Sequence, residues 1–370
     1  MRTILFACRN FDRMAGGVER IASLLMNEMV NRGNKVVLIT WDNSDSISHY
    51  FLNEEIKWIK LDLGEPNAKA SWILRLKRQI KIRNTIKKIA PSVIIGFQVG
   101  TFIAIRLAII GFFIPCIAAE RNSPDLFYYQ KNGKRNRFIA SIALLFAKCI
   151  TIQFEKYKFK YPYYLRSRIR TISNPVMPCN NPHLPNESNN LKKRILNVGR
   201  LSYQKNQLFL IRSFSLIAEK NPSWVLTIVG EGEYRKSLEE LILEKRLQNR
   251  VELIGKVKEI DIWYKKSSFF AFPSLWEGFP NALAEALRQG LPAVGLSTTA
   301  GVNELLIHKK NGLLTSHNES HFASCLQEMI SNTLFRKNAG RFASKSIQKF
   351  DPNIIFKQWE NLFAELSTKN

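Results

Sequence analysis

Strand-like and helix-like segments alternate along almost the whole chain of 370 residues. In the first half, short apolar runs of strand length stand at Ile4–Cys8, Lys35–Thr40 and Val93–Phe97, with longer helix-like segments between them. Two parallel strands need a long crossover connection, usually a helix, so this alternation predicts parallel sheets covered by helices. The length allows two such domains. We therefore expect an α/β protein with two halves.

A polar stretch rich in asparagine and proline separates the halves and ends near Asn190, and this composition is typical of a linker. We place the first domain at residues 1–176, the linker at 177–193, the second domain at 194–350 and a C-terminal helical segment at 351–370. The predicted helices are Val18–Asn31, Trp72–Ile89, 101–110, 136–148, Gln207–Glu219, Tyr234–Lys245 and Pro352–Leu366. The other predicted strands are Ile114–Ala118, those near 150–153 and 169–172, Ile195–Val198, Trp224–Val229, Val251–Ile254, Phe269–Pro273, Pro292–Gly295 and Gly312–Leu314. The strand at Phe269–Pro273 and the helix after it together span 268–289, and further helices close the chain.

The formal net charge is +25, and the first 180 residues carry +17 of it. No Asp or Glu occurs from Pro66 to Ala119. Such a basic half needs an anionic partner: nucleic acid, anionic lipid or a phosphorylated substrate. No run reaches the roughly 18–20 apolar residues of a spanning helix. The five cysteines are scattered without a CxxC pair, which favours neither a zinc site nor a disulfide framework and fits a reducing cytosol.

The segment Ser274–Ala286 follows a predicted strand and leads into a predicted helix. It places two carboxylates, Glu277 and Glu285, eight residues apart. We expect the backbone N–H groups of Phe279, Asn281 and Ala282 to point out of the helix start, where an anion or a sugar can accept from them. A helix that carries an acid near its N-terminus for dipole reasons would explain Glu285 alone. It would not explain Glu277 or the Gly-Phe-Pro-Asn turn.

Two other glycine-containing loops also follow predicted strands. In Val198–Asn206, Gly199 permits a close backbone approach at the carboxyl end of the sheet, and Arg200 and Lys205 could clamp a diphosphate there. The alternative is two exposed bases in a chain rich in them. Gly16 and Gly17 open a helix and could admit a phosphate at its N-terminus, although a plain loop would also explain them.

The Glu277–Glu285 segment resembles the Glu-x7-Glu motif of retaining glycosyltransferases of family four, which have the GT-B fold. Its fuller form is similar to bacterial enzymes that build surface polysaccharides and lipid-linked oligosaccharides. Gly199–Lys205 matches the family's Gly-Arg-Leu-x-x-x-Lys pyrophosphate clamp. The resemblance covers roughly the whole chain and is strongest from Arg194 to Leu314. It implies two Rossmann-like domains whose parallel sheets face each other across a cleft, with the last helix crossing back to the first domain.

The resemblance also implies roles for particular residues. Arg200 and Lys205 would stabilise the leaving diphosphate, while Glu277 would orient the donor sugar or act as a nucleophile. Glu285 would bind the ribose. The expected donor site is completed by Gly16, Gly17, Gly199, Val257, Gly278, Phe279, Pro280, Asn281, Ala282 and Leu283. Neither a metal nor a cofactor is implied, and the five histidines have no metal-ligand spacing.

The first domain departs from the family pattern, because no histidine lies between His49 and His183. Many members carry a histidine after a first-domain strand, where this chain has Glu120-Arg121. Either residue could orient the acceptor or a phosphate. A buried structural contact between the two is the alternative.

The basic helix 72–89 carries apolar residues among its bases, and its end, 82–89, is expected to face the core. The earlier part suits an anionic membrane surface, and a solvated surface helix is the alternative. The membrane-facing residues would be Trp72, Arg75, Lys77, Arg78 and Lys81.

Together these features predict a hexosyltransferase that works in the cytoplasm, on the inner face of the plasma membrane. Its expected partners are a UDP-linked sugar donor, a lipid-linked saccharide acceptor and anionic lipid, with no nucleic acid. The alternatives are a GT-B sugar phosphorylase or nucleotide-sugar epimerase, and a non-catalytic basic protein that binds membrane or nucleic acid.

Overall fold

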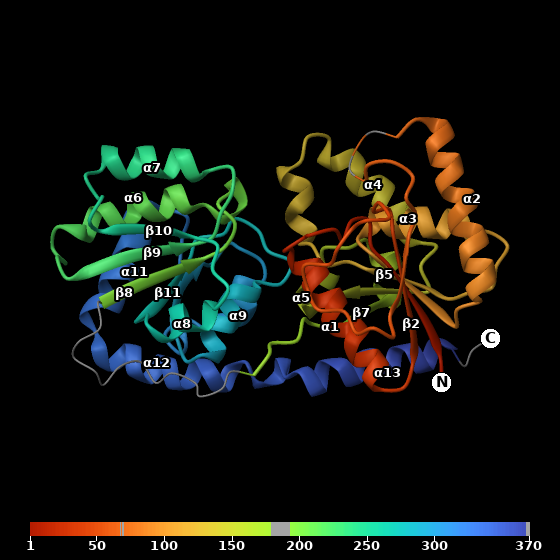
Figure 1. Ribbon diagram of the computed structural model, residues 1–370. Coiled ribbons are helices and arrows are strands. Elements are labelled where there is room, and N and C mark those ends of the chain that lie inside the picture. Colours follow the sequence, from red (N-terminus) through yellow and green to blue (C-terminus); the bar gives the residue numbers. More distant parts are fainter. Residues whose placement is uncertain (67, 69, 179–192, 368–370) are drawn as a thin grey trace. The chain divides into compact units, whose positions relative to one another are not determined.

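The computed structural model describes residues 1–66, 68, 70–178 and 193–367, and the chain divides into two compact units (Figure 1). Unit 1 contains Met1–Pro175 and Asn353–Asn370, and unit 2 contains Val176–Pro352. The predicted linker, 177–193, lies mostly outside the described residues. Each unit is built on one parallel sheet with helices on both faces, so the predicted α/β fold with two Rossmann-like domains is confirmed.

The sheet of unit 1 has the strand order β3-β2-β1-β4-β5-β6-β7, and all neighbouring strands are parallel. Its strands are β1 Thr3–Ala7, β2 Lys35–Thr40, β3 Lys57–Lys60, β4 Val93–Phe97, β5 Cys116–Ala119, β6 Cys149–Ile152 and β7 Ile169–Thr171. The order reverses between β1 and β4. In open α/β sheets, ligands bind beyond the carboxyl ends of the strands at such a switch point.

The helices of unit 1 form two layers (Figure 1), with α1 and α13 on one face of the sheet and α2, α3 and α4 on the other. Their bounds are α1 Gly17–Asn31, α2 Trp72–Ile89, α3 Val99–Ala108, α4 Gly133–Leu144, α5 Glu155–Lys158 and α13 Pro352–Ser367, with 3-10 turns η1 Pro124–Tyr129 and η2 Tyr163–Arg168. Helix α13 buries Trp359 and Phe363 in the core of unit 1. Arg32 on α1 donates to Glu360 on α13 over 2.8 Å, which ties the last helix of the chain to the first.

The sheet of unit 2 has the order β10-β9-β8-β11-β12-β13, again parallel throughout. Its strands are β8 Lys193–Val198, β9 Trp224–Val229, β10 Val251–Gly255, β11 Phe269–Phe272, β12 Ala293–Leu296 and β13 Gly312–Thr315. Its helices are α6 Gln207–Ala218, α7 Arg235–Glu244, α8 Ile260–Lys265, α9 Asn281–Arg288, α10 Val302–Leu305, α11 Glu319–Ser331 and α12 Thr333–Ser346, with 3-10 turns η3 Tyr203–Lys205 and η4 Gln348–Phe350. The switch point lies between β8 and β11, and the two strongest sequence motifs are the loops that follow these strands.

None of the helices in the described residues combines the length and the apolar character needed to cross a bilayer.

Candidate active site

The loops that follow β8 and β11 are joined to each other by hydrogen bonds. The backbone N–H of Leu275 donates to the carbonyl oxygen of Gln204 over 2.9 Å, and the side-chain amide of Gln204 donates to the carbonyl oxygen of Trp276 over 2.7 Å. Asn206 adds a hydrogen bond to the carbonyl oxygen of Pro273 over 3.3 Å. These bonds fix the 3-10 turn η3 against the loop that carries Glu277.

These hydrogen bonds between the two loops bring together two residues that were predicted from separate motifs. The Nζ atom of Lys205 lies 2.6 Å from Oε1 of Glu277, although the residues are 72 positions apart. Glu277 is only 5% exposed, and the Lys205 ammonium group also faces the Phe272 ring, 5.4 Å from its centroid. A carboxylate this deeply buried needs a cationic partner. A phosphate that binds at Lys205, as predicted, would share this residue with Glu277.

Glycines allow the carboxyl ends of β8 and β9 to approach each other closely. A Cβ added at Gly230, whose φ is +145°, would lie 1.9 Å from the carbonyl oxygen of Gly199. One added at Gly232 would lie 2.2 Å from the carbonyl oxygen of Leu201. The Gly199–Leu201 turn thus packs backbone against backbone on the loop after β9, with no room for a side chain at Gly230 or Gly232.

Arg200 lies in this turn with its side chain exposed. Its carbonyl oxygen accepts from the side-chain amide of Gln207 over 3.0 Å, which fixes the backbone. Among the described residues, no hydrogen bond or ion pair engages its guanidinium group. That group is therefore available to a ligand in a way that the ammonium group of Lys205 is not.

The Gly278–Asn281 turn corrects one prediction. The backbone N–H of Asn281 donates to the carbonyl oxygen of Phe279 over 2.8 Å, around Pro280 at φ −77° and ψ 75°. These values describe an inverse γ-turn. The N–H of Asn281 was predicted to point at a ligand, but it makes its hydrogen bond inside the turn. The ring of Pro280 favours this turn because it holds φ near −77°.

The side chains around this turn are largely structural. Phe279 is buried and packs against Phe350 with ring centroids 5.3 Å apart, and Leu283 is fully buried. Any contact that these two residues make with a donor would therefore come from their backbone. Val257 is half-buried in the loop after β10, and Gly255 at the start of that loop accepts a hydrogen bond from the N–H of Gly230 over 2.9 Å. The loops after β9 and β10 are joined by this bond.

Glu285 has a partner that the sequence analysis missed. Its Oε2 atom accepts a hydrogen bond from the hydroxyl group of Tyr264 over 3.1 Å. Tyr264 is fully buried and lies on α8, a short helix that was not predicted. Nothing in its local sequence distinguishes it from an ordinary core aromatic residue. The bond holds the second carboxylate of the motif in a defined orientation.

In unit 1, the N-terminus of α1 is covered by the protein's own carboxylate. A Cβ added at Gly16 would lie 2.0 Å from Oε2 of Glu19, so the Glu19 side chain folds back over this glycine. Gly17 begins the helix. A phosphate that binds at Gly16 and Gly17, as predicted, would first have to displace the Glu19 side chain.

Glu120 and Arg121 follow β5 and have different surroundings. Arg121 is buried, and its guanidinium donates to Ile172 O over 2.9 Å and to the Thr151 hydroxyl over 2.7 Å. It also lies over the Trp359 ring, 5.3 Å from the centroid. Arg121 thus has a structural role in the core of unit 1. Its hydrogen-bond partners are Ile172 and Thr151, whereas the structural alternative considered from the sequence was a contact with Glu120.

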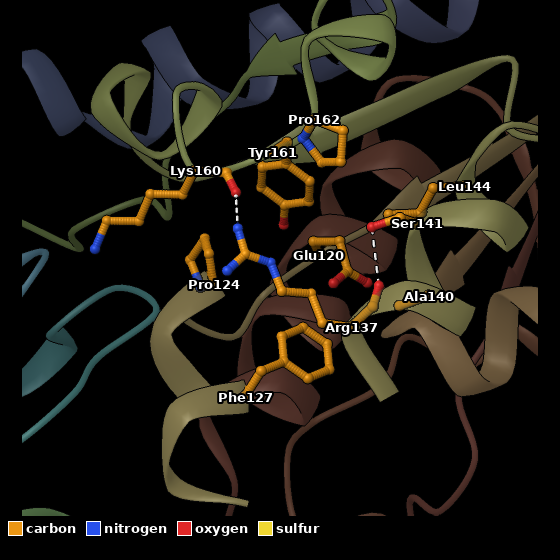
Figure 2. Close-up of a pocket in the computed structure, with 10 residues that line it drawn as sticks. All are labelled: Glu120, Pro124, Phe127, Arg137, Ala140, Ser141, Leu144, Lys160, Tyr161 and Pro162. Atoms are coloured by element: carbon orange, nitrogen blue, oxygen red, sulfur yellow. Dashed lines mark hydrogen bonds between the residues drawn. The ribbon is translucent and has the colours of Figure 1, made fainter. Parts of the chain in front are cut away.

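Glu120 faces a small cavity instead (Figure 2). Figure 2 shows its carboxyl group among the side chains of Tyr161, Arg137 and Ser141. The cavity volume of about 20 Å³ is room for about one water molecule, which is too small for a sugar. The Oε1 atom of Glu120 is enclosed and has no hydrogen-bond partner among the described residues. Burial raises the pKa of Glu120 to about 7, although the charge of Arg121 opposes this.

This burial predicts a pH-dependent stability. Glu120 has an ordinary pKa of 4.5, so between about pH 4.5 and 7 the folded chain holds a proton that the unfolded chain has released. Stability therefore falls as pH rises through this window, and the whole loss is present above pH 7. Glu120→Gln should raise the free energy of unfolding at pH 8 by about 1–3 kcal/mol and leave it unchanged at pH 4.

Urea unfolding at both pH values measures this difference. Glu240→Gln, on the exposed face of α7, is the matched control and should change neither value. If Glu120→Gln raises the free energy of unfolding equally at both pH values, or lowers it at pH 8, burial of the Glu120 carboxylate is not the cause.

Helix α2 also corrects a prediction. Arg78, predicted to face a membrane, is 5% exposed, and its guanidinium donates to the carbonyl oxygens of Leu63, Gly64 and Glu65. Lys81 donates to Leu61 O over 2.5 Å. The side chains of both residues thus donate hydrogen bonds to backbone carbonyl groups of the loop after β3. Trp72, Arg75 and Lys77 remain exposed, and the end of the helix faces the core through Ile82 and Ile86 as predicted.

Comparison with known proteins bears directly on unit 2. Residues 183–346 match the model of the family described as glycosyl transferases group 1. This chain carries a glycosyltransferase domain. The prediction of a glycosyltransferase is therefore confirmed, and the non-catalytic alternative is set aside.

Two relatives extend over nearly the whole chain. An uncharacterized glycosyltransferase of Haemophilus influenzae is 27% identical over 337 residues, 89% of each chain. A Campylobacter jejuni enzyme is 26% identical over 361 residues, 95% of this chain and 96% of its own. The latter is named as an α-1,4-N-acetyl-D-galactosaminyltransferase that acts on a GalNAc-containing saccharide linked to diphosphoundecaprenol.

Among solved structures, sucrose-phosphate synthase of Thermosynechococcus elongatus superposes with a TM-score of 0.84 over the full length of both chains, at 17% identity. This likeness supports the GT-B fold, and at this identity it says nothing of substrates.

No group of three His, Cys, Asp or Glu side chains in the described part of the chain could hold a metal ion. Independence from metals and cofactors stays a prediction.

Proposed function

We propose that this enzyme transfers a hexose or N-acetylhexosamine from a UDP-linked donor to a lipid-linked saccharide, with retention of anomeric configuration, in the assembly of a bacterial surface polysaccharide. The observation that carries the proposal is the 2.6 Å contact of Lys205 with Glu277, made by the loops after β8 and β11. Ligands bind beyond these strand ends in α/β sheets. The Campylobacter relative, named for a diphosphoundecaprenol-linked acceptor, supports the acceptor class.

Lys205 and Arg200 are proposed to stabilise the charge that grows on the departing diphosphate. An ammonium group has three donors, so Lys205 can hold Glu277 and a phosphate oxygen at once. The guanidinium group of Arg200 can donate two parallel hydrogen bonds to a phosphate. Glu277, oriented by Lys205, would accept hydrogen bonds from hydroxyl groups of the donor sugar.

Glu285 is proposed to accept hydrogen bonds from the ribose hydroxyl groups of the nucleotide. Its contact with Tyr264 supports this role because a carboxylate that is already oriented loses less entropy when it binds a ligand. Tyr264 would then be a positioning residue. The turns at Gly199 and Gly278 and the loop at Val257 are proposed to contact the nucleotide through their backbone.

The acceptor and the membrane belong to the same proposal. The excess positive charge of the first 180 residues suits a lipid diphosphate and the anionic lipid around it. In this view the enzyme works on the cytoplasmic face of the plasma membrane, needs no metal and binds no nucleic acid. Gly16 and Gly17 would bind a phosphate of the donor only after the Glu19 side chain moves, and Glu120 would contact the acceptor only after the small cavity opens.

The direct test incubates the protein with UDP-hexoses and UDP-N-acetylhexosamines, with and without a polyprenyl-diphosphate saccharide. We expect UDP release only when both substrates are present, and a product whose new linkage keeps the donor's anomeric configuration by NMR. Sugar 1-phosphate formed with inorganic phosphate would indicate a phosphorylase instead. Conversion of the donor sugar without an acceptor would indicate an epimerase.

A further inference from the structure

Helix α4 is apolar on its outward face as well as on its inward face. Its inward side buries Ala140 and Leu144 against unit 1. Its outward side and the turn after it expose apolar side chains, with Phe138 66% exposed and Phe146 60% exposed. We call these residues the α4 ridge: Phe138, Ile139, Ile142, Leu145 and Phe146. An ordinary surface helix has polar residues on this face, so the ridge needs a partner.

Basic residues surround the ridge. From Leu126 to Phe154 the chain has no Asp or Glu. Lys131, Lys134 and Arg135 are exposed around the beginning of α4, and Lys148 is exposed beyond its end. A partner of the ridge must therefore combine an apolar phase with negative charge.

The positions of these bases are unfavourable for the helix itself. The N-terminus of a helix carries a partial positive charge that favours acids and disfavours bases. The first turn of α4 has no acid, and it contains Lys134 and Arg135. Helix stability thus does not explain why bases occupy this turn.

The neighbouring helix extends the same character. Helix α3 packs beside α4 in unit 1 (Figure 1), and the turn after α3 exposes Phe113 by 93%. Helix α2 is less suited to an external partner because Arg78 and Lys81 are engaged by the loop after β3. Helix α2 also exposes apolar residues, Trp72 among them, but at α4 no hydrogen bond or ion pair in the described part of the chain engages the side chains of the exposed bases beside the exposed apolar residues.

We infer that the α4 ridge inserts into the interfacial layer of an anionic bilayer, with Lys131, Lys134, Arg135 and Lys148 paired to lipid phosphates. This inference rests on the proposed transfer to a lipid-linked acceptor and names the surface through which the enzyme reaches it. A bilayer interface supplies both the acyl chains that bury the ridge and the negative charge that the bases need. Nucleic acid would leave the ridge in water. A second copy of the chain would bring like charges together across a two-fold interface.

The test is flotation with vesicles of phosphatidylglycerol and phosphatidylcholine, compared with vesicles of phosphatidylcholine alone. The ridge variant combines Phe138→Gln, Ile142→Gln and Phe146→Gln. Its matched control combines Leu216→Gln, Leu243→Gln and Leu334→Gln, which removes three apolar side chains of similar exposure (54%, 59% and 71%) from unit 2. We expect the wild type and the control to float with the anionic vesicles. The affinity of the ridge variant for these vesicles should be lower by about 100-fold or more.

A charge variant separates the two contributions. Replacing Lys131, Lys134 and Arg135 with Gln should weaken binding by about fivefold per base at low salt and flatten its salt dependence. The ridge variant, in contrast, should bind vesicles weakly but with the same salt dependence as the wild type.

Equal vesicle binding by the ridge variant and its control overturns the inference. So does a wild-type dimer in analytical ultracentrifugation that the ridge variant abolishes without any change in vesicle binding, because the ridge would then be an interface between copies. UDP-dependent thermal shift and transfer to a water-soluble acceptor analogue are measured on the same variants. Those two readouts report on the proposed function, so its failure and the failure of the membrane surface are distinguishable.

Discussion

Replacing Lys205 with alanine should slow sugar transfer by about 10²-fold or more, the scale of a lost contact to charge that develops in the transition state. The same change removes the partner of Glu277, whose side chain is only 7% exposed. The free energy of unfolding should therefore also fall, by about 1–3 kcal/mol. Arg200→Ala should give a similar loss of transfer without a loss of stability, since Arg200 is exposed and no ion pair or hydrogen bond engages its guanidinium among the described residues.

Steady-state kinetics with donor and acceptor, together with urea unfolding, check both expectations. Lys236→Ala is the control, because this lysine is 88% exposed on α7 and removes the same charge away from the site. Near-normal turnover in both the Lys205 and the Arg200 variants would show that neither residue stabilises the leaving group.

Glu277→Gln and Glu285→Gln should have opposite effects on nucleotide binding. Glu277 competes with phosphate for Lys205, so Glu277→Gln should slow transfer by about 10²-fold or more while UDP binds as well as before or better. Glu285→Gln should weaken UDP binding by about tenfold, the cost of one good hydrogen-bonded contact. Tyr264→Phe should weaken UDP binding by less, since it removes one hydrogen bond to the carboxylate and leaves the carboxylate in place.

Calorimetry with UDP on the three variants measures these affinities. If UDP binding falls in Glu277→Gln and is preserved in Glu285→Gln, the two carboxylates have exchanged the roles that we assign to them.

The sequence predicts the well-patterned elements closely. Four predicted elements have the same bounds in the structure: Lys35–Thr40, Trp72–Ile89, Val93–Phe97 and Trp224–Val229. Several short elements were missed, among them β3 and α8. Strand β3 has only Trp58 and Ile59 between two lysines, too short an apolar run to distinguish it from a loop at the sheet edge. Helix α8 has six residues, fewer than two turns, so no helical period is measurable in it.

Site residues could be selected from the sequence, but their contacts could not. Lys205 and Glu277 belong to separate motifs, and their pairing depends on Gln204 and Asn206, which bind backbone groups of the other loop. The burial of Arg78 likewise depends on carbonyl groups that point out of a loop with no pattern of its own. In both cases polar side chains satisfy backbone atoms far away in sequence, and residue identities alone do not specify such partners.

Helix α13 has a consequence for the order in which the protein folds during synthesis. The core of unit 1 is complete only when Trp359, Phe363 and their neighbours arrive, yet the 177 residues of unit 2 are translated between Pro175 and Asn353. At about 5–20 residues per second, the ribosome needs roughly 10–35 s for that insertion. During this time one face of the unit 1 sheet is covered by α1 without α13, which completes its core. The domain that leaves the ribosome first is thus the last to become fully native, and a nascent chain stalled within unit 2 would present a partly uncovered apolar sheet to chaperones.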